Sequence, residues 1–320
     1  MTYLILFILS FTLTYLIKNY AIKKSLVAQV NERSSHTVPT PHGGGIAIAI
    51  TWFVGLCYLY ITDGINTSLF YAFSAGILIS VVSFFDDLYE LSPKIRLIVQ
   101  SSVAITGLIA IGGLQSIDLG LFAIENQFIT NLFAFLLIVW YINLTNFIDG
   151  INGYVGSMFV FLGVAGLILV GDVYFGVLIA SVLGFLYWNW NKAKIFMGDV
   201  GSTLLGYNIA IITLYYANEQ STNLWLWIIL FGLFWLDATV TLIRRKLNGE
   251  KLSQAHKKHA YQRLTQAGWS HYKVTNYSIA LNIVLFSIVY FVHNIFLAFF
   301  IAIIVLSLSI KYVDNKKRFE

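Results

Sequence analysis

Residues 128–153 read FITNLFAFLLIVWYINLTNFIDGING, an apolar run that ends in a cluster of amides and a carboxylate. The run can cross the hydrocarbon of a bilayer as a helix, which takes about 20 residues. Asn143, Asn146 and Asp149 follow at intervals of three residues, so they stay close to one face of the helix end. A polar cluster at the end of a membrane span is costly and therefore predicts a functional site.

The whole chain has the composition of an integral membrane protein. Of its 320 residues, 58% are hydrophobic and 11% are charged, and the mean hydropathy is +0.77. A soluble protein of this length is not expected to be so apolar. Because backbone groups in lipid must be satisfied internally and the apolar runs do not alternate as barrel strands do, we expect helices. The single cysteine, Cys57, excludes an internal disulfide and a thiolate metal cluster.

The apolar runs predict an all-α, polytopic membrane protein with about 11 transmembrane helices. We expect residues 1–320 to form a single domain, because the longest polar stretch, 244–275, is too short for a core of its own. The candidate spans are 2–22, 43–62, 66–85, 95–113, 128–148, 153–171, 173–190, 200–217, 223–243, 276–292 and 294–311.

The distribution of charge predicts the orientation of these spans. If the N-terminus lies outside, all 20 Lys and Arg residues fall on the inner side, as expected for cytoplasmic loops. We therefore expect the C-terminus in the cytoplasm. The pI near 9.1 then reflects membrane orientation and gives no reason to expect a nucleic-acid partner. The charged residues of the outer loops are all acidic: Asp63, Asp118, Glu125, Asp172 and Glu219.

Polar side chains that could do chemistry gather in loops on the predicted inner face. In 31–45, NERSSHTVPTPHGGG, the prolines stiffen the chain and the glycines open the next helix with bare N–H groups; close helix packing is the alternative. We expect one active site built from the cytoplasmic loops 23–45, 86–96, 143–153, 189–202 and 244–275.

Two adjacent carboxylates, Asp86 and Asp87, lie in the stretch FFDDLYE at the end of a span. They would repel each other unless a cation, a proton or a basic neighbour relieves them. The pair suits a Mg²⁺ site or a general base. The alternative is a solvated helix cap beside Lys94 and Arg96.

Another carboxylate, Asp199, lies between Gly198 and Gly201 in WNWNKAKIFMGDVGS, just before a span. A helix N-terminus with flexible backbone can hold an anionic phosphate beside a carboxylate-bound metal. A capping aspartate is the alternative for this residue.

The last inner loop contains SQAHKKHAYQRL, residues 253–264. If this segment is helical, His256, His259 and Arg263 share one stripe that could bind a diphosphate. A zinc site is the weaker interpretation, because no third ligand stands at metal spacing. An ordinary positively charged cytoplasmic loop would explain the lysines.

Together these motifs resemble the polyprenyl-phosphate N-acetylhexosamine-1-phosphate transferases, of the glycosyltransferase 4 type, and their branch that initiates O-antigen and capsule synthesis. The resemblance covers nearly the whole chain. It implies that a UDP-N-acetylhexosamine, GlcNAc or a 6-deoxy relative such as FucNAc or QuiNAc, gives its sugar-1-phosphate to undecaprenyl phosphate. The products are undecaprenyl-diphospho-sugar and UMP, and the cofactor is Mg²⁺, for which Mn²⁺ can substitute. The motifs, in family order, are PTPHGGG, FFDDLYE, NLTNFIDGING, FMGDVGS and AHKKHAYQRL.

The resemblance also implies roles for individual residues. By motif, Asp199 and Asn146 are metal ligands; Asp86 and Asp87 position or deprotonate the lipid phosphate; Asp149 is catalytic or supports the metal; Asn152, Asn189 and Phe196 hold the uracil; His256, His259 and Arg263 contact the diphosphate and sugar; and Lys94 and Arg96 meet the lipid phosphate.

The resemblance further implies a place in the bacterial inner membrane, with the site facing the cytoplasm, and it is compatible with a homodimer. Two other functions would account for part of the pattern. A transporter or flippase of lipid-linked sugars predicts polar sites on both faces and inverted repeats, which this chain does not show. A membrane phosphatase acting on lipid diphosphates would share the acidic and basic residues but would not need a uracil pocket.

Overall fold

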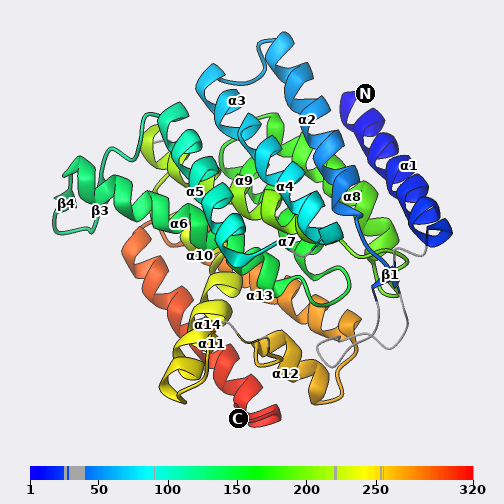
Figure 1. Ribbon diagram of the computed structural model, residues 1–320. Coiled ribbons are helices and arrows are strands. Elements are labelled where there is room, and N and C mark those ends of the chain that lie inside the picture. The colour runs from blue at the N-terminus through cyan, green and yellow to red at the C-terminus, as the bar shows by residue number, and fades with distance from the viewer. Residues whose placement is uncertain are drawn as a thin grey trace.

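The computed structural model describes residues 1–24, 27–28, 40–89, 91–219, 222–252, 254 and 256–319. Most of them are helical, which confirms the expected all-α architecture (Figure 1). The helices are α1 (Thr2–Lys23), α2 (Gly45–Ile61), α3 (Thr67–Ser74), α4 (Gly76–Tyr89), α5 (Pro93–Ala110), α6 (Gln127–Ile148), α7 (Tyr154–Leu169), α8 (Tyr174–Asn189), α9 (Asp199–Glu219), α10 (Leu224–Leu230), α11 (Gly232–Leu247), α12 (Ala260–Gln266), α13 (His271–Phe291) and α14 (Ile295–Lys316).

Two short antiparallel strand pairs connect helices. Strands β1 (Val27–Ala28) and β2 (Thr40–Pro41) pair with Val27 opposite Pro41, and β3 (Ile117–Asp118) and β4 (Ala123–Ile124) pair with Ile117 opposite Ile124. Residues 29–39, which belong to the expected site loop 23–45, lie outside the described residues, as do Glu90, Ser253 and Ala255 of the quoted motifs.

Helix length and composition support fewer membrane spans than the sequence suggests. In the described part of the chain, six helical segments are long and apolar enough to cross a membrane: α1, α3 with α4, α6, α9, α13 and α14. Helices α10 and α11, bent by 76° at their junction, can form a seventh. The other expected spans correspond to α5 and to the shorter apolar helices α2, α7 and α8. The structure therefore supports six or seven spans by these criteria, against an expected number of about 11.

Helix α9 lies in the middle of the bundle and packs against α2, α4 and α6 (Figure 1). Its most apolar window is 94% buried, whereas those of α1 and α14 are 22% buried. A helix that is apolar on all sides belongs in a protein interior. The N-terminus of α9, where Asp199 lies, is therefore surrounded by other helices.

Glycine lets the first turns of α2 and α9 touch. A Cβ on Gly45 would lie 2.2 Å from the backbone nitrogen of Gly201. The Gly45 N–H donates to the carbonyl oxygen of Met197 at 2.8 Å. Small residues permit such close approach of helices in membranes, and here they hold the loop before α2 against the segment that carries Asp199.

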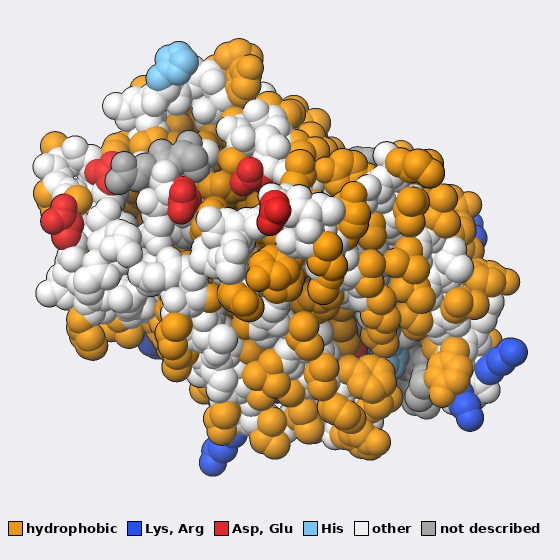
Figure 2. Space-filling view, turned by 90° about the horizontal axis from the view of Figure 1, so that it is seen from above, with side chains coloured by type: hydrophobic (Ala, Val, Ile, Leu, Met, Phe, Trp, Pro, Cys, Tyr) orange, Lys and Arg blue, Asp and Glu red, His pale blue; other side chains and the backbone are white. Residues whose placement is uncertain are grey.

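The two ends of the bundle differ in charge. Figure 2 views the end that carries the turn between α2 and α3, where acidic side chains gather and Lys and Arg appear only at the margins. Asp63 and Asp172, two of the acids expected in outer loops, line one polar cavity at this end. Helix α3 starts at this end and α4 continues it in one segment, Thr67–Tyr89, so the last turn of α4 lies at the opposite end.

Candidate active site

The last turn of α4 and the first turn of α5 meet through Asp86. Its side chain is 8% exposed, and one carboxylate oxygen lies 3.3 Å from the guanidinium of Arg96. The other oxygen accepts the Leu91 N–H at 2.7 Å. Ser92 caps α5, with Pro93 in the first turn, which fixes where α5 begins. Arg96 is thereby placed one turn into α5, facing the acid.

Asp87 turns toward α9 instead. Its carboxylate accepts the backbone N–H of Asp199 at 3.3 Å. A Cβ on Gly198, which has a φ of +76°, would lie 2.9 Å from the other carboxylate oxygen of Asp87. Glycine is therefore needed both for the turn and for the approach. The positive end of the α9 dipole favours an anionic group at this point.

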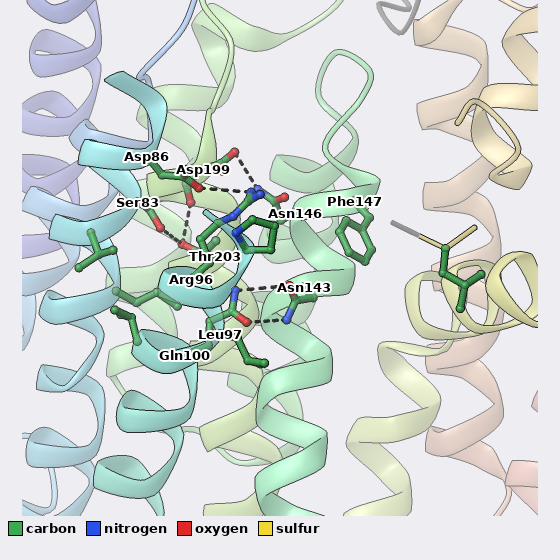
Figure 3. A pocket seen from close by; sticks show the side chains of 15 residues that line it. Ser83, Asp86, Arg96, Leu97, Gln100, Asn143, Asn146, Phe147, Asp199 and Thr203 are labelled. Carbon is green, nitrogen blue, oxygen red and sulfur yellow. Dashed lines mark hydrogen bonds and ion pairs between the residues drawn. The ribbon is translucent and has the colours of Figure 1, made fainter. Parts of the chain in front are cut away.

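The end of α6 reaches the same place through Asn146. Its amide nitrogen donates to the Asp199 carboxylate at 2.8 Å (Figure 3). The same nitrogen donates to the Ser202 hydroxyl at 3.1 Å. One turn earlier, the amide of Asn143 donates to the side-chain oxygen of Gln100 on α5 at 2.7 Å. The amides predicted to share one face of the helix end thus join α6 to both α9 and α5.

Asp149 caps the C-terminus of α6 and is half-buried. Burial, followed by the nearby carboxylates of Asp199 and Asp87, raises the pKa of Asp149 to about 8. Asp86 and Asp199 line the same cavity. The structure therefore brings together all four acids that the sequence singled out near the inner face: Asp86, Asp87, Asp149 and Asp199.

A cavity of about 370 Å³ opens between these elements (Figure 3). Its lining contains both polar and apolar side chains. The polar lining includes Ser83, Asp86, Arg96, Gln100, Asn143, Asn146, Asp199 and Thr203. The apolar lining includes Ile79, Val82, Leu97, Val99, Phe147 and, from the last loop, Leu252. An amphiphilic ligand with an anionic head fits such a lining.

The carboxylate and amide oxygens in the cavity are chemically suited to bind a hard cation. Carboxylate and amide oxygens are the ligands that Mg²⁺ prefers in proteins. Among the described residues, no group of three or more His, Cys, Asp or Glu side chains could hold a metal ion as placed. The fit therefore rests on the chemistry of Asp199, Asn146 and the neighbouring acids, whose mutual repulsion a cation would relieve.

The residues expected to hold uracil lie where the loops after α6, after α8 and before α2 meet. Asn189 accepts the Gly153 N–H at 2.7 Å and donates to the Ile195 carbonyl at 2.9 Å, so its amide ties two loops together. Asn152 donates to the Asn191 carbonyl at 3.1 Å. The side-chain oxygen of Asn152 is buried and has no partner among the described residues.

The aromatic member of this group, Phe196, is half-buried. Its backbone N–H donates to the Pro41 carbonyl at 2.8 Å, and its carbonyl accepts the Gly44 N–H at 2.9 Å. These bonds hold the loop before α9 beside the loop before α2. They place Phe196 next to the glycines that the sequence singled out.

The last loop is less helical than expected. Helix α12 begins only at Ala260, with His259 as its N-cap, so His256 lies outside the helix and the expected stripe does not form. The rings of His256 and His259 still lie close, with centroids 4.9 Å apart. Burial, followed by the neighbouring His259 and Arg245, lowers the pKa of His256 to about 4. His256 is therefore neutral at pH 7.

Two of the expected basic contacts do not line the cavity. A guanidinium nitrogen of Arg263 lies 2.5 Å from the carboxylate of Asp314 and donates to the Lys317 carbonyl at 3.0 Å, which holds Arg263 against α14. Lys94 is exposed in the first turn of α5. In the described part of the chain, Arg96 is the expected cation that lines the cavity.

Sequence reasoning missed two buried groups near this site. Asp237, 4% exposed, lies in α11, and Tyr261, 2% exposed, lies in α12. An acid within the apolar run 223–243 was a usable signal, because charge inside a span is rare and functional. Tyr261 gave no signal in sequence, since a tyrosine in a polar loop is unremarkable.

The fold and the site define a helical, multi-pass membrane protein with an acid- and amide-lined cavity at the end of its spans. Residues 69–217, which include most of the polar lining, match the family described as glycosyl transferase family 4. The probable undecaprenyl-phosphate N-acetylglucosaminyl 1-phosphate transferase of Bacillus subtilis (strain 168) is 34% identical over 276 residues, which cover 81% of this chain and 75% of the relative.

Two further relatives carry similar names. The undecaprenyl-phosphate alpha-N-acetylglucosaminyl 1-phosphate transferase of Yersinia pestis is 29% identical, over 83% of this chain and 76% of the relative. The decaprenyl-phosphate N-acetylglucosaminephosphotransferase of Mycobacterium leprae is 28% identical, over 83% of this chain and 77% of the relative. The chain belongs to the polyprenyl-phosphate N-acetylhexosamine-1-phosphate transferases of glycosyl transferase family 4, and the family expected from the motifs is confirmed.

Proposed function

We propose that this protein transfers N-acetylhexosamine 1-phosphate from a UDP-linked donor to undecaprenyl phosphate. An oxygen of the lipid phosphate attacks the β-phosphorus of the donor, and the bond from that phosphorus to the bridging oxygen breaks. The products are undecaprenyl-diphospho-sugar and UMP. The observation that carries the proposal is the cavity that Asp86, Asn146 and Asp199 line together with apolar side chains.

The two kinds of lining match the acceptor. The guanidinium of Arg96 can pair with a lipid phosphate, because Arg forms charge-assisted bonds with phosphate oxygens. Ile79, Val82 and Leu97 offer an apolar surface for the first isoprene units. In this arrangement Asp86, already 3.3 Å from Arg96, orients the guanidinium. Asp87 remains available to position or deprotonate the lipid phosphate.

The donor diphosphate is placed near the N-terminus of α9. We assign Asp199 and Asn146 to a Mg²⁺ ion, with Asp149 in support, and Mn²⁺ has the same ligand preferences in kind. When bound, the ion neutralises charge on the phosphate oxygens during transfer. Phosphoryl transfer needs positioning and charge neutralisation more than covalent help from the protein.

The nucleoside is placed in the group formed by Asn152, Asn189 and Phe196. The buried side-chain oxygen of Asn152 is an acceptor for the N–H of uracil. Phe196 offers an aromatic face for stacking. Asn189, whose amide is used by two loops, supports the pocket from behind.

The cellular setting follows from the charge distribution. We assign the acidic end of the bundle to the outer surface and the cavity to the cytoplasmic side of a bacterial inner membrane, where nucleotide sugars are available. The donor sugar is GlcNAc or a 6-deoxy relative such as FucNAc or QuiNAc. The product would initiate O-antigen, capsule or cell-wall glycan synthesis.

The experiment combines purified protein, undecaprenyl phosphate and a panel of radiolabelled UDP-N-acetylhexosamines. The expected result is label in the lipid phase for one sugar, with one UMP released for each lipid labelled. Label that stays in the aqueous phase for every sugar of the panel contradicts the proposal. Release of inorganic phosphate from a lipid diphosphate, without any need for UDP-sugar, would point to a phosphatase instead.

A further inference from the structure

A buried acid lies in α11 outside the cavity. Asp237 is 4% exposed, and α11 follows α10 after a bend of 76°. One carboxylate oxygen accepts the Thr241 hydroxyl at 3.1 Å and the backbone N–H of Ala260 at 2.8 Å. The same oxygen lies 3.6 Å from a ring nitrogen of His259. A carboxylate in an apolar helix is costly, so this one requires an explanation.

The contacts of Asp237 fix the start of α12. Ala260 is the first residue of that helix and His259 is its N-cap. The side-chain oxygen of Gln262 accepts the His259 N–H at 3.3 Å and completes a capping box. Asp237, which lies in α11, therefore forms a hydrogen bond with the first residue of α12.

Tyr261, which follows Ala260 in α12, connects the start of this helix to the site. Tyr261 is 2% exposed. Its ring stacks on His259 with centroids 5.9 Å apart and makes a tilted contact with Tyr154, with centroids 5.2 Å apart. A residue so enclosed moves only if the start of α12 moves with it.

The Tyr261 hydroxyl contacts the turn at the end of α6, which carries Asn146 and Asp149. It donates to the carbonyl oxygen of Phe147 at 3.3 Å. A Cβ on Gly150 would lie 2.2 Å from the same hydroxyl, so the turn and the tyrosine fit closely. Phe147 lines the cavity, and the turn carries Asn146 at one end and Asp149 within it.

We infer that Asp237 is a positioning residue for the transfer reaction: through Ala260 and His259 it holds Tyr261 against the turn that places Asn146 and Asp149. The inference rests on the proposed function and adds a residue that touches neither substrate. In this interpretation, the last loop stabilises the position of the turn that follows α6.

A purely structural role explains Asp237 less well. Its second carboxylate oxygen is buried without a hydrogen-bond partner among the described residues. Replacing a buried ionic group by apolar side chains of similar volume is often neutral or stabilising. Stability alone would therefore not favour an acid at this position, whereas alignment of α12 requires an acceptor for the Ala260 N–H.

The test uses the full-length protein with four single variants and one double variant. Asp237→Ala removes the acceptor, Asp237→Asn keeps an acceptor oxygen, and Tyr261→Phe removes the hydroxyl at the far end. Thr241→Val is the matched control, because it deletes another bond to the same carboxylate without touching α12. Each variant is assayed for kcat, for KM of both substrates, for melting temperature and for hydrogen–deuterium exchange in residues 147–153.

We expect Asp237→Ala to lower kcat about 100-fold, since a displacement of ~1 Å in a catalytic group can cost that much. Tyr261→Phe should lower kcat about 10-fold, as expected for one lost hydrogen bond of a neutral group. The double variant Asp237→Ala with Tyr261→Phe should be no slower than Asp237→Ala alone, because both act along one chain of contacts. Exchange in 147–153 should rise in both single variants, whereas Thr241→Val should leave kcat and exchange near wild type.

Asp237→Asn should retain kcat to within about threefold, since the acceptor for Ala260 remains. Effects of Asp237→Ala and Tyr261→Phe that multiply, or unchanged exchange in 147–153, overturn the inference. If Asp237→Ala does not fold, Tyr261→Phe decides alone: kcat and exchange at wild-type values overturn the inference. Because exchange is measured without substrate, failure of the inference is distinguishable from absence of turnover in the wild type, which overturns the proposed function.

Discussion

The side-chain amide of Asn146 donates to the carboxylate of Asp199 across 2.8 Å and 53 residues of sequence. This bond joins the last turn of α6 to the first turn of α9, the most buried of the candidate membrane spans in the described part of the chain. The same amide also donates to the hydroxyl of Ser202 at 3.1 Å. The bond fixes the direction of the Asp199 carboxylate at the wall of the cavity.

The variant Asp199→Asn should insert and fold normally but lose transfer. An asparagine keeps the size of the side chain and removes the charge that a cation needs, so we expect kcat to fall by about 10³-fold or more. Thermal unfolding in detergent and the lipid-transfer assay measure the two effects. Ser202→Ala, which loses the longer bond to the same amide, is the control and should retain kcat to within about fivefold. Turnover retained in Asp199→Asn would remove the metal role of this residue.

The raised pKa of Asp149 predicts how stability depends on pH when chelator keeps divalent ions away. The folded-state pKa of about 8 lies above the unfolded value, so the folded protein binds more protons than the unfolded chain between about pH 4 and pH 8. The contribution to stability is therefore fully present below the unfolded pKa and is lost as the pH rises through the folded one. The loss is at most about 1.4 kcal/mol per pH unit.

Melting temperature measured in EDTA from pH 5 to pH 8.5 checks this dependence. Asp149→Asn should make the profile less steep, because the amide does not titrate. Adding Mg²⁺ at pH 8 should raise the melting temperature of the wild type, since the ion replaces the missing proton among the carboxylates. A wild-type profile that matches that of Asp149→Asn would show that Asp149 ionises freely.

The convergence of Asp86, Asn146 and Asp199 could be anticipated from sequence, because each follows or precedes an apolar run on the side that carries the lysines and arginines. The partner of each residue could not. That Asp86 faces Arg96 while its neighbour Asp87 faces α9 depends on where Ser92 starts α5 and on the turn at Gly198. These contacts depend on tertiary packing, which produces no periodic pattern in the sequence.

The last loop shows a second kind of limit. Spacing alone allowed a helix through His256 and Arg263, but α12 starts at Ala260 because Asp237, on another helix, accepts the Ala260 N–H. Hydropathy likewise could not fix the number of spans. Helices α7 and α8 are 16 residues long, and their apolar character reflects burial against neighbours as much as contact with lipid.

Packing of α2 against α9 predicts that Gly45→Ala destabilises the protein. The new methyl group would meet backbone, 2.2 Å from the nitrogen of Gly201, and backbone cannot move aside as a side chain can. We expect a loss of about 3 kcal/mol, at the upper end for overpacking. Gly64→Ala is the matched control, since its methyl would meet a flexible Leu59 side chain at 3.1 Å. Equal melting temperatures for the two variants would contradict the close contact.

The ion pair between Arg263 and Asp314 separates a structural role from a substrate contact. Arg263 is 3% exposed and its guanidinium lies 2.5 Å from the Asp314 carboxylate. Asp314→Ala would leave a buried cation without its partner, and because Asp314 itself is 30% exposed we expect a loss of about 2 kcal/mol, below the value for a fully buried pair.

Arg263→Ala should lower the melting temperature by less, since Asp314 would keep its ion pair with Arg244. Because Arg263 and Asp314 do not line the cavity, both variants should leave the KM for the UDP-sugar within about twofold of wild type, since neither removes a contact with the substrate. Stability and KM are measured on the same preparations. A KM that rises in Arg263→Ala but not in Asp314→Ala would instead assign Arg263 to the diphosphate or sugar, as the family resemblance implies.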